Sequence, residues 1–184
     1  MSSFEIKDGV AIIPEGTNKI PSHAFEDCSS LISVVIPEGV TSIGRRAFAD
    51  CNRLTTINIP NGVTSIGERA FLWCFALDSI TIPDSVKSIG WKAFSGCSLT
   101  EITIPNSVTS IGKEAFVDCE SLEDITIGNS VTSIGESAFA RCESLFSITF
   151  RGTIAQWKEI ELGDNWSKEI PAKVVQCIDG DVEI

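Results

Sequence analysis

The chain has 184 residues, of which 43% are hydrophobic, and a formal net charge of -11 from 25 acidic and 14 basic residues. This hydrophobic fraction excludes a disordered chain, and no apolar run approaches the roughly 18 residues of a membrane span. The negative charge opposes binding to nucleic acid or to an anionic membrane surface. Residues 1–7 contain neither the basic nor the apolar stretch of a secretion signal. We therefore expect a soluble protein, either cytoplasmic or preceded by a leader outside this sequence.

Residues 1–12 are expected to form an N-terminal cap. They contain alternating residues around a Lys7-Asp8-Gly9 turn, which is typical of a short hairpin. Such a hairpin would cover the first coil of a stacked structure, whose apolar face and strand edge would otherwise be open.

One sequence frame then recurs from residue 13 to residue 150. Its phenylalanine returns every 23 residues, apart from one spacing of 22 residues, at Phe25, Phe48, Phe71, Phe94, Phe116 and Phe139. Self-similarity at a fixed period in the twenties is the signature of a solenoid. We expect one structural domain in which each coil buries its apolar residues against the next.

Each repeat contains three segments. The first is a strand such as residues 54–59, whose alternate residues are apolar, and Pro60 ends it because proline cannot donate to a ladder. A second extended segment follows at residues 63–66. Gly67 then marks a bend where a side chain or a negative φ would be unfavourable. The Ala-Phe pair that ends at Phe71 is expected to begin a single helical or 3₁₀ turn.

Seven cysteines are present, and six of them occupy one position of the repeat. Because successive coils lie roughly 4.7–4.9 Å apart, each cysteine would have two equivalent neighbours, and a pairwise disulfide scheme would have to break the repeat. We interpret them as buried thiols that act as small hydrophobic residues. The single histidine, His23, lies at a different repeat position. We therefore expect no metal site and no cofactor.

The single spacing of 22 residues has a local origin. The sequence Cys97-Ser98-Leu99 has one residue fewer between Cys and Leu than the other repeats. The positions that form the core are unaffected. We expect a tighter turn and a small irregularity in stacking rather than a boundary between domains.

Residues 151–184 are expected to form a C-terminal cap of a short helix and a hairpin. Thr153 and Gln156 have the spacing of a capping box, and Trp157 would lie on the helix face over the last coil. The Asp179-Gly180 pair indicates the turn of a terminal hairpin.

The repeat unit in residues 51–73, C-x-x-L-x-x-I-x-I-P-x-x-V-T-S-I-G-x-x-A-F-x-x, resembles the BspA-like class of leucine-rich repeats. The resemblance covers residues 13–150, and Gly152-Thr153 with Gln156-Trp157 is similar to the C-terminal cap of bacterial members. It implies a mainly β, leucine-rich repeat solenoid. This would be a right-handed coil of about six 22–23-residue repeats, each with two short strands and a helical turn.

The resemblance also implies binding rather than chemistry. Proteins of this class resemble surface proteins of bacteria and some protists, and they are implicated in adhesion to host proteins or to other cells. This would place the chain at the cell surface or outside the cell. Glu101 and Asp124 on adjacent strands could mimic a glycosidase dyad, but such a dyad needs a pocket. The sequence has no nucleophile elbow, P-loop or dinucleotide fingerprint, so we expect no enzyme activity.

The first binding candidate is a concave sheet formed by the first strands. Six strands would span roughly 24 Å, enough to hold a peptide or a loop of another protein. The alternative interpretation is that small polar residues merely suit solvated strand positions. The candidate residues are Thr56, Asn58, Ser79, Thr81, Glu101, Thr103, Asp124, Thr126, Ser147 and Thr149.

The second candidate is an aromatic and basic flank. Exposed aromatic side chains favour interfaces and could support a homodimer or stack on sugar rings. Alternatively, the rings cover their own turns and the basic side chains form an ordinary solvated face. The candidate residues are Trp73, Phe75, Trp91, Arg46, Arg69 and Lys92. Our leading hypothesis is a protein-binding module. The alternatives are a structural or self-associating module and a carbohydrate-binding module.

Overall fold

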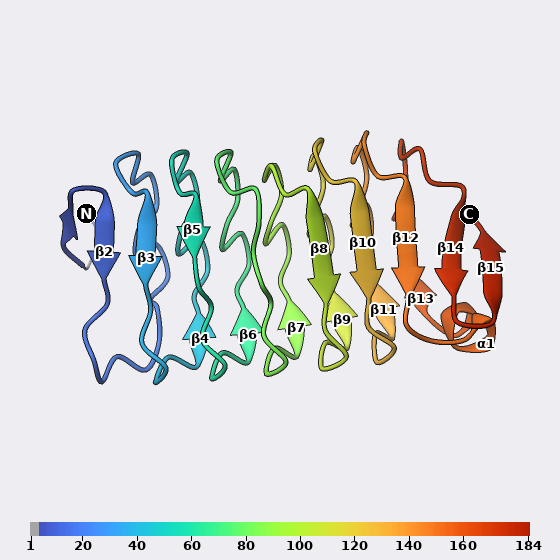
Figure 1. The fold of residues 1–184 in the computed structure, drawn as a ribbon, viewed down its shortest axis with the longest axis horizontal. Coiled ribbons are helices and arrows are strands. Elements are labelled where there is room, and N and C mark those ends of the chain that lie inside the picture. Colours follow the sequence, from blue (N-terminus) through green and yellow to red (C-terminus); the bar gives the residue numbers. More distant parts are fainter. Residues whose placement is uncertain (1–3) are drawn as a thin grey trace.

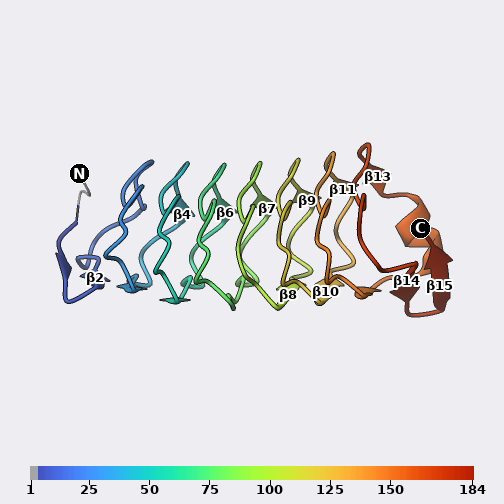
Figure 2. The ribbon, with the colours of Figure 1, turned by 90° about the horizontal axis from the view of Figure 1, so that it is seen from above.

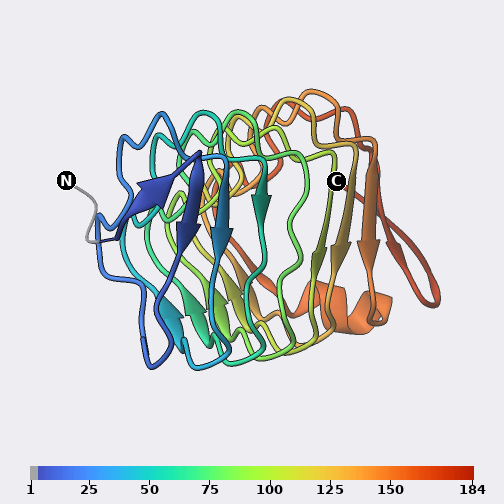
Figure 3. The same cartoon turned by 60° about the vertical axis from the view of Figure 1, so that its left-hand side comes forward.

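The computed structural model describes residues 4–184, so residues 1–3 of the predicted N-terminal cap lie outside the described part. The chain forms a β-solenoid of about seven turns (Figures 1 and 3). Two ladders of short strands run along the stack, and a column of turns forms its third side. The stack is nearly straight when seen from the front and from above (Figures 1 and 2).

The N-terminal end is covered by a hairpin. β1 (Ile6–Lys7) pairs antiparallel with β2 (Val10–Ile12). The two turn residues, Asp8 and Gly9, both have positive φ, which suits a tight hairpin turn. β2 then pairs in parallel with the first repeat strand, so the hairpin begins the ladder and occupies its edge.

The first strands of the repeats lie on one side of the stack, which we call the first-strand face. It carries two sheets, ordered β1-β2-β3-β5 and β15-β14-β12-β10-β8. All pairings between repeats are parallel, and equivalent residues lie in register, as for Thr103 with Thr126. The remaining strands of this face are β3 (Ser33–Val35), β5 (Thr56–Ile57), β8 (Glu101–Ile104), β10 (Asp124–Ile127), β12 (Ser147–Phe150), β14 (Val174–Cys177) and β15 (Gly180–Glu183).

The second ladder is continuous. It contains β4 (Ser42–Ile43), β6 (Ser65–Ile66), β7 (Ser88–Ile89), β9 (Ser110–Ile111), β11 (Ser133–Ile134) and β13 (Glu161–Leu162), all paired in parallel with their neighbours. Each two-residue strand places a serine outward and an aliphatic residue inward, except β13, where both residues are exposed. This ladder holds the coils at an even spacing.

The third side differs from the expected helical turn. Each repeat instead contains successive β-turns, such as the pair closed by Ala47 N–H to Gly44 O and by Cys51 N–H to Phe48 O. The third residue of each of these two turns has a positive φ, 52° at Arg46 and 61° at Asp50. Two such residues per repeat turn the chain back toward the next first strand. Backbone bonds such as Phe48 N–H to Ala70 O join this side to the next coil.

Of the two reasons expected for the recurring glycine, the exclusion of a side chain is confirmed and the positive φ is wrong. Gly67 is absent from the residues with positive φ. Its α-carbon instead faces the preceding coil: a Cβ atom there would lie 2.7 Å from the carbonyl carbon of Gly44 and 2.7 Å from the carbonyl oxygen of Ile43. Glycine is therefore required because two backbones approach closely, not because of its own backbone conformation.

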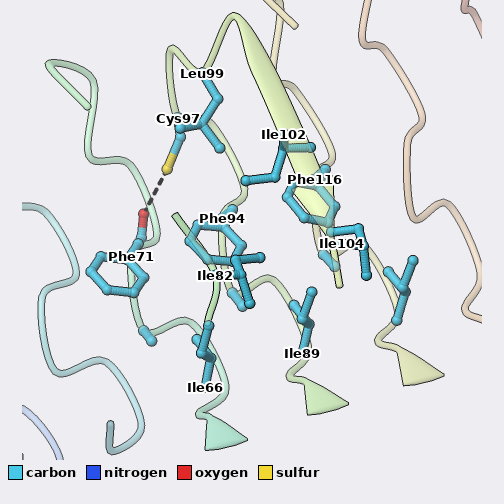
Figure 4. Close-up of a cluster of buried hydrophobic side chains, with 14 of the residues drawn as sticks. Ile66, Phe71, Ile82, Ile89, Phe94, Cys97, Leu99, Ile102, Ile104 and Phe116 are labelled. Carbon is cyan, nitrogen blue, oxygen red and sulfur yellow. Dashed lines mark hydrogen bonds between the residues drawn. The ribbon is translucent and has the colours of Figure 1, made fainter. Parts of the chain in front are cut away.

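The core is a column of phenylalanine rings between the two ladders (Figure 4). Consecutive rings from Phe25 to Phe139 stack with centroids 5.2–5.4 Å apart and nearly parallel planes. Isoleucine side chains from both ladders surround them, including Ile66, Ile89 and Ile104. Each ring thus contacts the coil before it and the coil after it.

The cysteine column lies beside this core, and all seven cysteines are free thiols. The six in the column were predicted to be buried; five of them are, whereas Cys28 is half-buried. Cys97 Sγ donates a hydrogen bond to Phe71 O at 3.1 Å (Figure 4). Equivalent bonds recur at Cys51, Cys74, Cys119 and Cys142, each to the phenylalanine carbonyl of the preceding coil. The column therefore satisfies one buried carbonyl per coil.

The buried thiols should be unreactive in the folded protein. Burial raises the pKa of Cys51 and Cys97 to about 12. At pH 8 we expect a disulfide reagent to modify only the half-buried Cys28 and Cys177, and all seven thiols after unfolding. Rapid modification of five or more thiols in native protein would contradict this assignment.

The pKa of the Cys51 thiol also makes stability depend on pH. Because Cys51 would ionise near pH 9.0 when unfolded but only near 12 when folded, its contribution to the free energy of unfolding is complete below pH 9 and is lost as pH rises toward 12.

The C-terminal segment continues the coil after a short helix. α1 (Ile154–Lys158) has the expected capping box between Thr153 and Gln156. The chain then returns to the second ladder through β13, and the following turn bonds to the last repeat through Phe139 N–H to Trp166 O. This bond is equivalent to those that join the repeats, so residues 161–177 form a further, divergent turn. β14, the last part of this coil, then pairs with β15 in a hairpin.

Candidate binding surface

The first-strand face presents the first group of predicted residues. On β8, Glu101 and Thr103 are exposed, whereas the alternate residues Ile102 and Ile104 are buried. The same alternation holds on β10 and β12, so the side chains form two rows on one face. Glu101, Asp124 and Ser147 are in register in one row, and Thr103, Thr126 and Thr149 in the other.

This face is not the concave surface that the sequence predicted. The coils stack along a nearly straight axis, so the face is nearly flat along the stack (Figure 2). The physical reason is that each coil has short extended segments on both of its long sides. A bulky helix on one side would wedge the coils apart and bend the stack, but the repeats contain none among the described residues.

The face is interrupted at one place. β5 ends one sheet and β8 ends the other, although one repeat lies between them. In that repeat, residues 78–83 form no strand, and residues 79–82 make no backbone hydrogen bond to either neighbouring strand within the described chain. Figure 1 shows β5 and β8 separated by this segment. The flanking edges of β5 and β8 therefore have no strand partner, although residues 78–83 lie between them.

The interruption contains a groove of about 450 Å³, which we call the front groove. Ile80 lies in it and is only half-buried, whereas the equivalent Ile57, Ile102 and Ile125 are buried. The groove therefore has a floor of core isoleucines beneath a polar rim. It is lined by Ile57, Ser79, Ile80, Thr81, Ile82, Asp84, Glu101, Ile102, Thr103, Pro105 and Arg151.

The charges at the front groove are unpaired. Asp84 and Glu101 form no ion pair and accept no side-chain hydrogen bond from any described residue. On the turn side, by contrast, Glu114 pairs with Lys92 at 2.9 Å. Although burial opposes it, the Lys92 hydrogen bond and charge lower the pKa of Glu114. Arg151 is the single basic residue that lines the groove.

The predicted aromatic and basic flank divides into two parts. The Trp91 side chain already has partners within the chain. The Arg69 guanidinium lies 3.8 Å from the centroid of the Trp91 ring, and Trp91 Nε1 donates a hydrogen bond to Glu114 Oε1 at 3.4 Å. Trp73 and Phe75 are 45% and 56% exposed and line a smaller groove of about 200 Å³. The three basic residues are engaged in ion pairs, Arg46 with Glu26, Arg69 with Glu68 and Lys92 with Glu114.

Several residues of the front groove were not predicted from the sequence. Its isoleucine floor occupies core positions, and neither Asp84 nor Arg151 lies in the two exposed rows. The one available signal was the shortened Cys97-Ser98-Leu99 turn, which immediately precedes β8. Exposed apolar residues at the N-terminal end of this face, Ile12 and Val35, were also not predicted as site residues.

The described residues contain no group of three or more potential metal ligands. No helix in the part of the chain that the structure describes is long and apolar enough to cross a membrane.

Comparison with known proteins gives a consistent picture. The sequence matches the family described as BspA type leucine-rich repeat region, with six copies over residues 9–119 and 64–162. A comparison with curated proteins gives no match.

Three similar solved structures are bacterial leucine-rich repeat proteins. One, from T. pallidum, is 30% identical with a TM-score of 0.76, over 84% of this chain and 73% of that one. Another, from Bacteroides ovatus, is 35% identical with a TM-score of 0.76, over 89% and 50%. A leucine-rich cell surface protein from Faecalibacterium prausnitzii is 27% identical with a TM-score of 0.55, over 92% and 60%. The chain thus spans from half to nearly three quarters of these proteins.

Proposed function

We propose that this chain, which belongs to the BspA-type leucine-rich repeat family, is a non-catalytic module that binds a protein partner on its first-strand face. The family and the fold are those of repeat scaffolds that commonly mediate protein interactions. The finer proposal is adhesion or recognition at a bacterial surface. The similarity to a leucine-rich cell surface protein supports that setting.

The front groove is the observation that carries this proposal. It combines the half-buried Ile80, an interruption of the strand ladder and two unpaired carboxylates on one face. Interfaces are typically built from an apolar centre within a polar rim. The rows of Ser, Thr and Asp residues on β10 and β12 extend this rim beyond the groove.

The same features argue against a catalytic role. Glu101 and Asp124 are both exposed on the open face, and Asp124 does not line the front groove. A glycosidase pair requires two carboxyl groups that face a substrate in a closed site, which this open face does not provide.

The aromatic flank is the weaker candidate for a binding surface. Trp91 and the basic residues already have partners within the chain, which leaves Trp73 and Phe75 as its exposed part. Self-association or glycan binding would have to depend on these two rings. This restriction makes the alternatives separable by mutation.

The test is a binding screen with matched variants. The chain is screened by biolayer interferometry against purified extracellular-matrix and serum proteins and against a glycan array. We expect saturable binding of a protein that Thr126→Arg on the first-strand face weakens about tenfold, through a bulky charge in the contact. Thr132→Arg, at the exposed residue just before β11 in the same repeat, is the control and should leave affinity unchanged.

Two results would overturn the proposal. One is binding that is lost in Trp73→Ala but retained in Thr126→Arg, which would assign function to the aromatic flank. The other is binding to glycans alone. Circular dichroism of each variant verifies that the fold is intact.

A further inference from the structure

We infer that the groove beside Trp73 and Phe75, which we call the aromatic groove, binds the guanidinium group of an arginine side chain of a partner protein. The inference goes beyond the proposed function, because this groove lies on the turn side of the stack and not on the first-strand face. Its shape, its free aromatic rings and its charge carry the inference. The groove has a volume of about 200 Å³ and is lined by Trp73, Phe75, Gly96, Cys97, Ser98, Asp118, Glu120 and Ser121.

The aromatic groove lies where one turn is missing from the fourth repeat. In the other five repeats a β-turn follows the cysteine and is closed by a Leu N–H to Cys O bond, as at Leu77 with Cys74. Residues 97–99 are too few for this turn, and no such bond forms there within the described chain. The lining residues come from this repeat and from the repeats on either side, so the groove spans the gap. Its outer walls lie two coils apart, roughly 10 Å by strand spacing.

One wall of the aromatic groove consists of two rings without partners. Gly96 gives the Trp73 ring its place, since a Cβ there would lie 2.5 Å from Trp73 Cδ1. Trp73 and Phe75 are both exposed, and neither ring contacts another ring or a cation in the part of the chain that the structure describes. Both rings are therefore available to a ligand.

The other wall of the aromatic groove is acidic. Glu120 forms no ion pair and accepts no side-chain hydrogen bond from any described residue. Asp118 also lines the groove and pairs with Arg141 at 2.7 Å. No basic residue is among the lining residues, and the whole chain has a net charge of -11. A cation between the two walls would be attracted by the aromatic rings and by the free carboxylate.

The chain itself contains a contact of this kind, at Trp91. The Arg69 guanidinium lies 3.8 Å from the centroid of the Trp91 ring, and Trp91 Nε1 donates a hydrogen bond to Glu114. The Lys92 ammonium lies farther from the same ring, at 5.7 Å. A planar guanidinium can stack on an aromatic face, whereas an ammonium is a compact and strongly hydrated charge. Because Trp73 has no such cation among the described residues, we expect the partner to supply an arginine.

The probe is the tripeptide Ac-Gly-Arg-Gly-NH2, titrated into the isotope-labelled full chain and followed by NMR through the indole N–H signal of Trp73. This signal is assigned by its absence in Trp73→Asn, since asparagine suits the φ of 56° at this position. We expect a saturable shift with a dissociation constant on the order of 1–10 mM, as befits one side chain. The citrulline analogue, which keeps the shape without the charge, should bind at least about tenfold more weakly. The lysine analogue should bind about threefold more weakly.

Two matched pairs of variants place the peptide in the aromatic groove. Phe75→Ala removes one of its rings and should weaken binding about threefold, whereas Phe146→Ala, at an exposed phenylalanine outside the groove, should not change it. Glu120→Gln should also weaken binding about threefold, whereas Glu143→Gln, at the equivalent position of the next repeat, should not. All four variants change exposed side chains, so circular dichroism can verify that their folds are intact.

Several outcomes would overturn this inference. They are the absence of a shift, equal binding of the citrulline analogue, equal or tighter binding of the lysine analogue, and equal affinities of Phe75→Ala and Phe146→Ala. A Trp73 signal that moves on dilution of the protein alone would assign the groove to a second copy of this chain. A signal that moves with glycans and not with the peptide would assign it to a sugar. In each case, protein binding that Thr126→Arg weakens would still support the proposed function.

Discussion

Phe94→Ala is expected to lower the free energy of unfolding by about 3–5 kcal/mol. The Phe94 ring is fully buried and stacks between Phe71 and Phe116, with centroids 5.3 Å away on both sides. Removing it leaves a cavity that the neighbouring coils cannot close, because hydrogen bonds on the second ladder fix their spacing. The loss therefore includes both the buried apolar area and the contacts of the cavity lining.

Urea unfolding monitored by circular dichroism measures this effect. The matched control is Phe146→Ala, which makes the same chemical change at a side chain that is 70% exposed. It should shift the free energy of unfolding by less than about 0.5 kcal/mol. Equal losses in the two variants would show that the phenylalanine column does not carry the stability of the stack.

The repeat architecture was predictable because the period fixes which residues meet. A residue in one coil lies against its equivalent in the next, so six copies of one motif specify the phenylalanine and cysteine columns at once. The observed register, for example Ser65 with Ser88, follows directly from this repetition. Membership of the BspA-type leucine-rich repeat family agrees with that prediction.

The front groove could not be predicted in the same way. Residues 79–82 have an ordinary strand sequence, Ser-Ile-Thr-Ile, yet they form no ladder. Pairing depends on the fit between neighbouring coils, and this repeat lies next to the shortened turn at residues 97–99. The missing residue predicted a small irregularity in stacking, but it did not indicate that residues 79–82 would form no strand.

The turn side was mispredicted for a related reason. Arg69 and Trp73 have φ values of 55° and 56°, although neither residue type favours this conformation. They adopt it because backbone hydrogen bonds to the next coil, such as Trp73 N–H to Ser95 O at 2.8 Å, hold them there. Tertiary bonds outweigh local preference, so residue-by-residue propensity could not identify these turns.

The divergent last turn was also hidden from the repeat pattern. Residues 161–170 read Glu-Leu-Gly-Asp-Asn-Trp-Ser-Lys-Glu-Ile, with Trp166 at the position of the usual alanine. Gly163 keeps the close approach to the preceding coil, since a Cβ there would lie 2.3 Å from the Glu136 nitrogen. A search for Ala-Phe misses this turn, but the Leu-Gly pair could have identified it.

Gly112→Ala is expected to destabilise the protein by about 1–3 kcal/mol or more, because it forces two backbones apart. An added Cβ would lie 2.7 Å from the Gly90 carbonyl carbon and 2.8 Å from the Ile89 carbonyl oxygen. Both atoms belong to the main chain of the preceding coil, so no side-chain rearrangement can relieve the overlap. Urea unfolding gives the loss. Gly39→Ala is the control, because its nearest neighbour would be the Thr17 carbonyl oxygen at 3.6 Å.

Gly112→Asn distinguishes close approach from backbone conformation as the reason for glycine. If glycine were present to allow a positive φ, asparagine would be the best tolerated replacement, because it adopts that conformation more readily than alanine. Gly112 does not have a positive φ, so asparagine gains nothing and adds a larger side chain to the same contact. We therefore expect Gly112→Asn to destabilise the fold at least as much as Gly112→Ala. A milder effect of asparagine would restore the conformational explanation and contradict the contact between the two backbones.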